Sequence, residues 1–366
     1  MREDTDDYLK LFLDDIPLMD VRAPVEFAKG AFPNAINVPI LDDAQREAIG
    51  TRYKQAGQDE AIRLGLELAT PEIRRQRLDA WSDFIERYPE GYLYCFRGGL
   101  RSRTAQAWLR EQGIDYPLVR GGYKALRRFL IDELERSIEA QTFWILSGMT
   151  GSGKTRVLRR IRHHVDLEGL ANHRGSAFGR AVDDWQPQQI DFENSLSIAL
   201  LRHRHRHPGQ PLWLEDEGRL IGRLLLPDSL VERMRRAPRV HLQRSTAERV
   251  RIIREDYIAD NWPGYRERYG DAAREHFSSF VLDNLDRIRK RLGGERHARL
   301  RVLFSEALER LFEDGDASGF DAGIELLLTD YYDPMYRYQL ESKPHQRLFE
   351  GDEEAVVAWS EAQRSA

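Results

Sequence analysis

The stretch Leu93–Ser102 reads LYCFRGGLRS and contains the only cysteine of the chain, Cys95. The apolar residues around it predict a short buried strand over Tyr92–Cys95, and the apolar spacing that follows predicts a helix over Ser102–Gln112. A glycine-rich loop between a strand and a helix turns backbone N–H groups toward one centre, beside a helix end whose dipole attracts anions. This stretch therefore predicts an α/β domain built around an anion-binding loop.

The sulfur of Cys95 is predicted to lie at the centre of this loop, and Arg97 and Arg101 follow it in the sequence toward the helix. Positive charges and a helix N-terminus favour the thiolate, which is the reactive form of cysteine. A free cysteine is also a common small hydrophobic core residue, so that alternative stays open. We predict that Cys95 is a nucleophile or a carrier of sulfur or selenium, with Arg97 and Arg101 holding the anion.

The composition of the whole chain limits the possible classes of protein. A length of 366 residues predicts about two domains. No apolar run approaches the length of a membrane span, and the acidic N-terminus is unlike a secretory signal. One cysteine excludes an intramolecular disulfide, which fits a reducing cytoplasm, and the net charge of −5 does not by itself indicate nucleic acid. We expect a cytoplasmic protein that does not interact with membranes.

Four segments of the N-terminal part form a pattern. They are Asp20–Phe27 (DVRAPVEF), Gly30–Pro39 (GAFPNAINVP), the cysteine loop and Arg120–Leu126 (RGGYKAL). With these segments, residues 1–138 resemble a rhodanese domain, an α/β fold whose loop cysteine carries sulfur or selenium. The sequence departs from that family where Ala31 replaces a frequent histidine, and in a long polar insert at about 41–81. The insert is either an arm toward RNA or another domain, or a helical excursion without function.

A second glycine-rich loop, Gly148–Thr155 (GMTGSGKT), follows a predicted strand, Thr142–Ser147, and precedes a predicted helix, Arg156–His163. Strand, loop and helix in this order are the context of a P-loop, which wraps phosphates with backbone N–H groups. We predict that its lysine reaches the terminal phosphates and that its threonine binds Mg²⁺. The predicted phosphate-binding residues are Gly148, Gly151, Ser152, Gly153, Lys154 and Thr155.

The P-loop predicts that residues 139–366 form a P-loop NTPase-like domain, with a doubly wound parallel sheet and a helical, arginine-rich C-terminal part. A strand predicted at Val165–Leu167 leads into a polar loop on the expected ligand side of that sheet. Its candidate ligand residues are Asp166, His173, Arg174 and Ser176.

Asp216 follows the predicted strand Pro211–Leu214 and is our candidate for a second Mg²⁺ partner beside Thr155. An acidic strand end in solvent is the alternative. The alternating histidines of His203–His207 would suit a metal, but the arginines between them and the following Pro-Gly predict an exposed turn.

Beyond Arg244 the chain is predicted to be helical, with many arginines and with aromatic residues such as Tyr257 and Trp262. Basic groups mixed with aromatic rings are typical of proteins that bind splayed RNA bases. A solvated helix face produces the same pattern of charge, so this signal alone does not distinguish the two.

The order of these two domains resembles the family of bacterial tRNA 2-selenouridine synthases over nearly the whole chain. Besides the two loops, the segments that carry the resemblance are Tyr53–Gln55, Gly121–Arg127, Asp166–Ala171, His173–Gly179, Leu214–Glu217 and Tyr331–Tyr338. The resemblance implies an enzyme that converts 2-thiouridine to 2-selenouridine at the tRNA wobble position. In that family, geranyl diphosphate first alkylates the sulfur, and selenophosphate then supplies selenium.

The implied partners are therefore tRNA, geranyl diphosphate and selenophosphate, with Mg²⁺ and without a tightly bound organic cofactor. We expect a monomer. Two other functions stay open on the residues alone. One is an ATP-dependent RNA sulfurtransferase or kinase that uses the same P-loop and cysteine; the other is a binding module with an inactive rhodanese domain.

Overall fold

The computed structural model describes residues 2–173, 185–341 and 346–363. The chain divides into two compact units, one of residues 1–139 and 188–206, the other of residues 140–187 and 207–366. The predicted division, 1–138 and 139–366, differs from this in the segment Gln188–Arg206. That segment forms a helix whose polar and apolar contacts are with the first unit, as described below.

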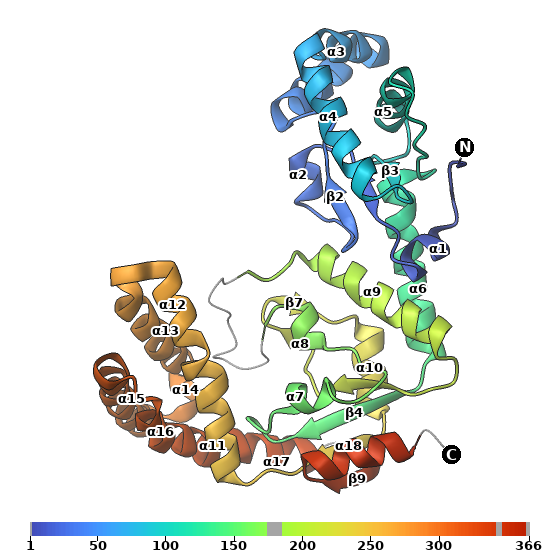
Figure 1. The fold of residues 1–366 in the computed structure, drawn as a ribbon. Helices are drawn as coiled ribbons and strands as arrows, with labels where there is room; N and C mark the ends of the chain where they lie inside the picture. Colours follow the sequence, from blue (N-terminus) through green and yellow to red (C-terminus); the bar gives the residue numbers. More distant parts are fainter. Residues whose placement is uncertain (1, 174–184, 342–345, 364–366) are drawn as a thin grey trace. The chain divides into compact units, whose positions relative to one another are not determined.

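The first unit contains a three-stranded parallel sheet in the order β2-β1-β3 (Figure 1). The strands are β1 (Leu18–Asp20), β2 (Ala35–Asn37) and β3 (Tyr92–Tyr94). The helices are α1 (Tyr8–Leu13), α2 (Pro24–Phe27), α3 (Asp43–Leu68), α4 (Pro71–Arg87), α5 (Leu100–Glu111), α6 (Gly122–Ala140) and α9 (Gln189–Arg206). The polar insert is the pair α3 and α4, and Gly57 kinks α3 with a φ of 85°. The unit is an α/β fold with parallel strands, as predicted.

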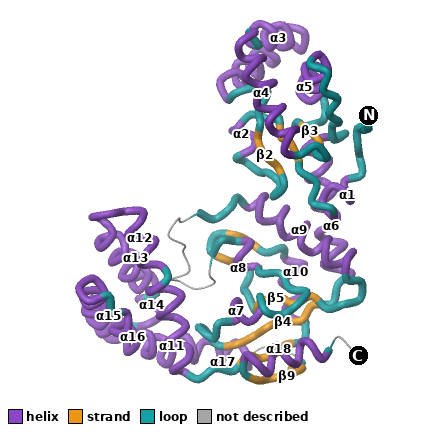
Figure 2. The backbone as a smooth tube through the Cα atoms, in the orientation of Figure 1, coloured by secondary structure: helices purple, strands orange, loops and turns teal. Residues whose placement is uncertain are grey.

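The second unit is organised around a parallel sheet in the order β5-β4-β8-β9, with the central β4 leading into the P-loop (Figure 2). Its strands are β4 (Phe143–Gly148), β5 (Leu212–Glu215), β8 (Arg239–Leu242) and β9 (Arg347–Gly351); β6 (Leu220–Ile221) and β7 (Leu224–Leu225) form a small antiparallel pair. The helices near the sheet are α7 (Lys154–Leu158), α8 (Leu167–Leu170), α10 (Asp228–Arg236) and α18 (Glu353–Ala362). The predicted parallel sheet, with a glycine-rich loop between its central strand and α7, is confirmed.

The arginine-rich C-terminal part is a helical bundle with its own apolar core, as predicted. Its α-helices are α11 (Thr246–Arg254), α12 (Asn261–Tyr269), α13 (Ala273–Arg287), α14 (Arg289–Leu292), α15 (Gly294–Asp314), α16 (Asp321–Leu327) and α17 (Asp333–Glu341). Two π-helices, η1 (Glu255–Ala259) and η4 (Leu328–Tyr332), and two 3₁₀ turns, η2 (Gly270–Ala272) and η3 (Ala317–Phe320), lie between them. Among the described residues, no helix has both the length and the apolar character needed to cross a membrane.

Three local predictions are wrong. The strand predicted at Val165–Leu167 is absent, since His164 makes only an isolated bridge to Trp213 and α8 begins at Leu167. Helix α7 ends at Leu158 instead of His163, whose φ of 58° is incompatible with a continuing right-handed helix.

The exposed turn predicted at His203–His207 is also wrong. Residues up to Arg206 are helical, and His203 is buried. Arg202 donates from Nε to the carbonyl of Phe12 at 2.8 Å, and Arg204 pairs with the buried Glu133. The basic side chains are therefore used to attach the helix to the first unit, and the charge pattern alone does not reveal such partners.

Candidate functional site

The cysteine loop of the first unit runs from the end of β3 to the start of α5. The side chain of Cys95 is 3 % exposed and packs in an apolar cluster of the first unit. Two hydrogen bonds hold the loop against α6: Tyr123 N–H donates to the Cys95 carbonyl at 2.9 Å, and Lys124 N–H donates to the Phe96 carbonyl at 2.9 Å. The first turn of α6 thus fixes the loop backbone directly after the Cys95 side chain.

Gly122 makes this close approach possible. Its φ is 59°, and a Cβ built there would lie 2.2 Å from the Cys95 carbonyl oxygen and 2.5 Å from the Gly98 nitrogen. Only glycine tolerates both the left-handed backbone and the missing space. The paired glycines of the closing segment therefore shape the cysteine loop.

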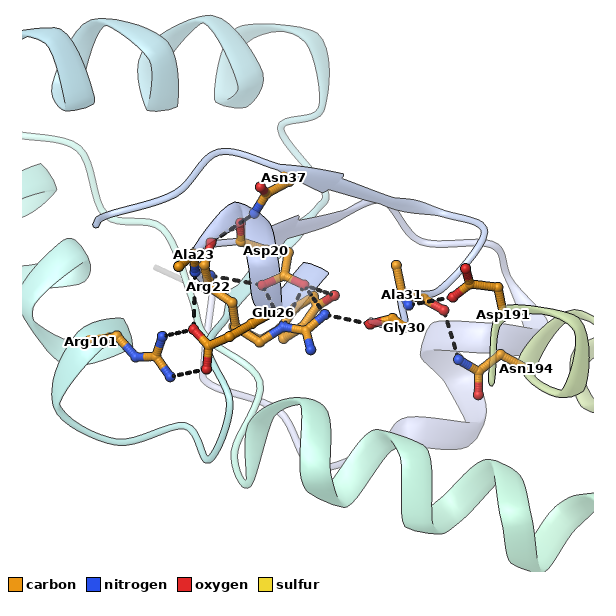
Figure 3. Close-up of polar contacts among 11 residues, drawn as sticks. Asp20, Arg22, Ala23, Glu26, Gly30, Ala31, Asn37, Arg101, Asp191 and Asn194 are labelled. Atoms are coloured by element: carbon orange, nitrogen blue, oxygen red, sulfur yellow. Dashed lines mark hydrogen bonds and ion pairs between the residues drawn. The ribbon is translucent and has the colours of Figure 1, made fainter. Parts of the chain in front are cut away.

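The two arginines predicted to hold an anion differ in their surroundings. Arg97 is exposed on the loop, whereas Arg101 forms a bidentate pair with Glu26, with Nη2 3.1 Å from Oε1 (Figure 3). Burial would raise the pKa of Glu26, but the hydrogen bonds and charge of Arg101 outweigh it and lower that pKa. Much of the charge of Arg101 is therefore neutralised within the protein, and Arg97 is the better placed of the two to meet an anion.

The Asp-Val-Arg segment serves the fold beneath the loop. The buried Arg22 donates from Nε to both carboxylate oxygens of Asp20, at 3.0 and 2.8 Å, and from Nη2 to the Gly30 carbonyl at 2.8 Å (Figure 3). Its guanidinium also lies 3.9 Å from the ring centre of Tyr123, next to Gly122. Because every one of these groups is buried, the network fixes the start of α6 relative to the sheet.

Helix α9 continues this support. Ala31 N–H donates to Asp191 Oδ1 at 2.6 Å, and Asn194 Nδ2 donates to the Ala31 carbonyl at 2.7 Å (Figure 3). Arg127 in turn donates to Asn194 Oδ1 at 2.7 Å. At the position where rhodanese domains often have histidine, this protein thus uses the backbone of Ala31 to hold a helix from a distant part of the sequence.

The insert forms one wall of a large cavity beside the cysteine loop. A cavity of about 1100 Å³ is bounded on one side by the loop residues Arg97 and Arg101, and on the other by side chains of α3, including Tyr53 and Lys54. Of the two interpretations of the insert, this placement favours the functional one, because the insert forms part of the wall beside the cysteine loop.

In the second unit the P-loop has the geometry that its sequence predicts. Gly151 and Gly153 have φ values of 79° and 73°, and α7 begins at Lys154. Lys154 Nζ donates to the Gly148 carbonyl at 3.0 Å, and Thr155 Oγ1 donates to Glu168 Oε2 at 2.9 Å. Lys154 thus folds back onto the loop, and Thr155 binds a carboxylate outside it. A phosphate bound in the loop would compete for both donors.

The carboxylates near Thr155 are not the predicted one. Glu168 at the start of α8 contacts Thr155, and Glu215 Oε2 accepts from the N–H groups of Leu167 and Glu168 at 3.0 and 3.3 Å. Asp216 instead pairs with the buried Arg239 at 2.5 Å. Asp216, just beyond the end of β5, is therefore held by Arg239, whereas Glu168 is the carboxylate that contacts Thr155 directly.

Burial and mutual repulsion disturb the ionisation of this acidic group. Burial, with the nearby Glu168 as the next cause, raises the pKa of Glu215 to about 9 and that of Glu217 to about 8. Lys154 acts in the opposite direction on Glu217. Within the described ranges, no set of three or more His, Cys, Asp or Glu side chains forms a ready metal site. The cluster is therefore rich in carboxyl groups, of which Glu215 and Glu217 are mostly protonated at neutral pH, and it needs further ligands to hold a cation.

Replacing Glu217 with glutamine should reduce the pH dependence of stability. The carboxyl ionises near its ordinary pKa in the unfolded chain but only near pH 8 in the folded protein, so wild type loses stability as pH rises across this interval. Between pH 6 and pH 9 in metal-free buffer, the Tm of wild type should fall by about 3 °C more than that of Glu217→Gln. The exposed Glu306→Gln provides a control that should behave as wild type. Identical pH dependence in all three proteins would contradict the assignment.

Arg249 joins the P-loop to the C-terminal segment. This fully buried side chain donates from Nε to the Thr150 carbonyl at 2.9 Å and from Nη1 to Asp333 Oδ2 at 3.0 Å. Nothing in the charge pattern of the arginine-rich part distinguishes Arg249 from a surface arginine. The only signal was the position of Asp333 within the segment Tyr331–Tyr338.

The predicted ligand loop is described only in part. Asp166 caps α8 by accepting from Gly169 N–H at 2.6 Å, and it also pairs with Arg159 at 2.7 Å. His173 lines the cavity over the P-loop together with Lys154. Arg174 and Ser176 lie outside the described residues. The two predicted centres, at Cys95 and at the P-loop, belong to different units.

Comparisons with known proteins cover both units. A family model described as the tRNA 2-selenouridine synthase AAA domain matches residues 141–366, and a rhodanese-like domain model matches residues 5–128. Three curated relatives carry the name tRNA 2-selenouridine synthase. The protein of Marinobacter nauticus is 56% identical over 365 residues (100% of this chain, 99% of the relative), that of Alcanivorax borkumensis 51% over 360 residues (98% and 99%), and that of Pseudomonas fluorescens Pf-5 49% over 354 residues (97% and 97%).

Proposed function

Because the chain belongs to the tRNA 2-selenouridine synthase family, we propose that it is an enzyme that converts 2-thiouridine to 2-selenouridine in tRNA. The observation that carries this proposal is the match along the full chain, which includes both the cysteine loop and the P-loop. Each loop is an anion site of a different kind, and the proposed conversion uses two anionic substrates, geranyl diphosphate and selenophosphate.

In the first proposed step, the thiouridine sulfur attacks C1 of geranyl diphosphate. The C1–O bond breaks with its electron pair going to diphosphate, a sulfur lone pair forms the C1–S bond, and the N3 proton is lost to solvent. Thiocarbonyl sulfur is a poor leaving group, whereas the resulting thioether can depart as a thiol. The P-loop supports this step because Lys154 and the loop N–H groups stabilise the charge that develops on diphosphate.

A divalent cation fits the oxygen donors around the P-loop. Thr155, Glu168 and Glu217 would hold it together with substrate phosphates, the usual arrangement for Mg²⁺. When bound, Mg²⁺ would add positive charge beside the departing diphosphate. The cation would at the same time favour ionisation of the half-buried Glu217, whose pKa is otherwise raised.

In the second proposed step, selenium replaces the geranylated sulfur at C2. The C2–S bond breaks to release geranylthiol, a C2–Se bond forms, and the selenium–phosphorus bond of selenophosphate is hydrolysed to give phosphate. Selenium in selenophosphate is already fully reduced, so loading selenium itself onto Cys95 would require an oxidant. We therefore assign Cys95 as the nucleophile that attacks phosphorus and releases selenide, with Arg97 near the phosphoryl oxygens and water later removing the phosphoryl group.

Gly122→Ala should impair this second step selectively. The new methyl group would meet the Cys95 carbonyl oxygen at 2.2 Å and displace the loop. A displacement of about 1 Å at a reacting group can cost on the order of 10²-fold in rate. The measurement is conversion of S-geranylated tRNA to selenouridine. Gly113→Ala is the matched control, because its φ of 76° imposes the same backbone strain with no atom within 4 Å; equal rates for both variants would contradict the proposed shaping of the loop.

The proposed function is tested by mass spectrometry of tRNA nucleosides after incubation with both substrates and with each omitted in turn. Omission of selenophosphate should leave S-geranyl-2-thiouridine, and omission of geranyl diphosphate should leave 2-thiouridine unchanged. If ATP replaced geranyl diphosphate in supporting the reaction, the protein would be an ATP-dependent sulfurtransferase or kinase instead.

A further inference from the structure

An apolar cavity of about 50 Å³ lies in the C-terminal helical bundle and reaches the P-loop at Thr150 and Gly151. Its other walls come from α11, α13, α15 and α16, with buried side chains that include Val281, Phe304 and Leu327. Among the described residues, no charged side chain lines it. A cavity of this composition favours an apolar occupant over a polar one.

This apolar cavity shares a wall with a polar cavity of about 340 Å³ over the P-loop. Gly151, Ile253 and Tyr257 border both of them, and Lys154 and Thr155 border only the polar one. A ligand that occupies both cavities would need a phosphate group in the polar one and an apolar tail in the other. A nucleotide base does not suit the apolar side, because its polar edge would be left without hydrogen-bond partners.

Two π-helices meet at the apolar cavity. Tyr257 and Ile258 belong to η1, and Leu328 and Tyr332 belong to η4; all four line the cavity. π-Helical turns are rare and occur frequently at functional sites. The two π-helices are far apart in the sequence but line the same cavity. A core with a purely structural role does not require such an arrangement.

Tyr332 is a second observation that indicates a ligand-binding role for this region. Its hydroxyl oxygen is buried and has no hydrogen-bond partner among the described residues. An unsatisfied buried hydroxyl is costly, and phenylalanine would serve a purely structural core better. The aromatic ring of Tyr257, which borders both cavities, also offers a π face that stabilises positive charge, which develops on an allylic carbon as diphosphate leaves.

We propose that the apolar cavity holds the terminal isoprene unit of geranyl diphosphate and sets the length of prenyl chain that the protein accepts. This inference rests on the proposed function and adds a subsite to it. A volume of 50 Å³ corresponds to roughly four water-sized groups, which suits one five-carbon unit rather than the whole ten-carbon chain. The first isoprene unit then lies along Gly151 and Tyr257, between this cavity and the diphosphate on the P-loop.

The test compares Phe304→Leu with Phe277→Leu. Both phenylalanines are buried in the same apolar core, at 3 % and 0 % exposure, but only Phe304 lines the cavity. The measurement is kcat/KM for S-alkylation of thiouridine tRNA with dimethylallyl, geranyl and farnesyl diphosphates, which share one head group. Wild type should prefer geranyl; Phe304→Leu should raise the farnesyl-to-geranyl ratio about tenfold or more, and Phe277→Leu should leave it unchanged.

A filling variant, Leu327→Phe, provides an independent measurement should Phe304→Leu fold poorly. It should lower the geranyl-to-dimethylallyl ratio about tenfold or more, while inhibition by inorganic diphosphate stays as in wild type because the head group does not enter this cavity. If wild type transfers geranyl but the ratios change equally in cavity and control variants, the subsite is wrong and the proposed function stands. If wild type transfers no prenyl group with any of the three diphosphates, both are overturned.

Discussion

Lys154→Ala should abolish geranylation of tRNA while leaving the selenation of previously geranylated tRNA largely intact. Only the first proposed step expels diphosphate, and Lys154 is the P-loop cation that bears on it, with its Nζ 3.0 Å from the Gly148 carbonyl. Loss of one charged contact to a leaving group in such a site should cost on the order of 10²-fold or more in rate, by analogy with oxyanion-hole deletions. The two steps are measured separately by mass spectrometry of tRNA nucleosides, starting from thiouridine tRNA or from S-geranylated tRNA.

Lys10→Ala makes the same change of charge at an exposed position on α1 and should leave both steps unchanged. Thermal unfolding of the Lys154→Ala protein establishes that the variant is folded. If a folded Lys154→Ala protein lost both steps equally, the proposed division of the chemistry between the two loops would be wrong.

Cys95→Ser should produce the opposite result, with accumulation of S-geranyl-2-thiouridine and no detectable selenouridine. Serine preserves the size and burial of the side chain, so the apolar cluster around it should remain packed. Its hydroxyl is a far weaker nucleophile than a thiolate, and the loss of a catalytic nucleophile commonly costs on the order of 10⁴-fold or more. The geranylation measured in the same sample is an internal control for folding and tRNA binding.

Incubation with selenophosphate and geranylated tRNA isolates the step in which Cys95 is expected to act. Selenouridine formation by Cys95→Ser at near the wild-type rate would show that selenophosphate reacts with the base directly. The rhodanese loop would then serve as an anion site only, with Arg97 and the helix N-terminus of α5 as its functional parts.

The sequence alone was sufficient to predict the two glycine-rich loops, their flanking strands and the α/β class of both parts. Each loop is a short contiguous segment whose backbone conformation depends on glycines within it, such as Gly151 and Gly153, so nearby residues carry the information. The resemblance to a known family was visible for the same reason, since its segments are local. The segment Val165–Leu167 shows the limit of this reasoning, because its apolar residues are buried without forming a strand.

Only the tertiary structure decided which carboxylates face the P-loop and what supports each loop. The pairing of Asp216 with Arg239 depends on how β5 and β8 are each registered against β4, which lies between them, and the contact of Arg249 with Asp333 joins residues 84 positions apart. Helix α9 likewise finds its partners in a segment that precedes it by more than a hundred residues. Such contacts depend on how buried faces pack in the folded chain, where water is excluded. The residues next to a side chain in sequence do not determine which distant side chain it will contact.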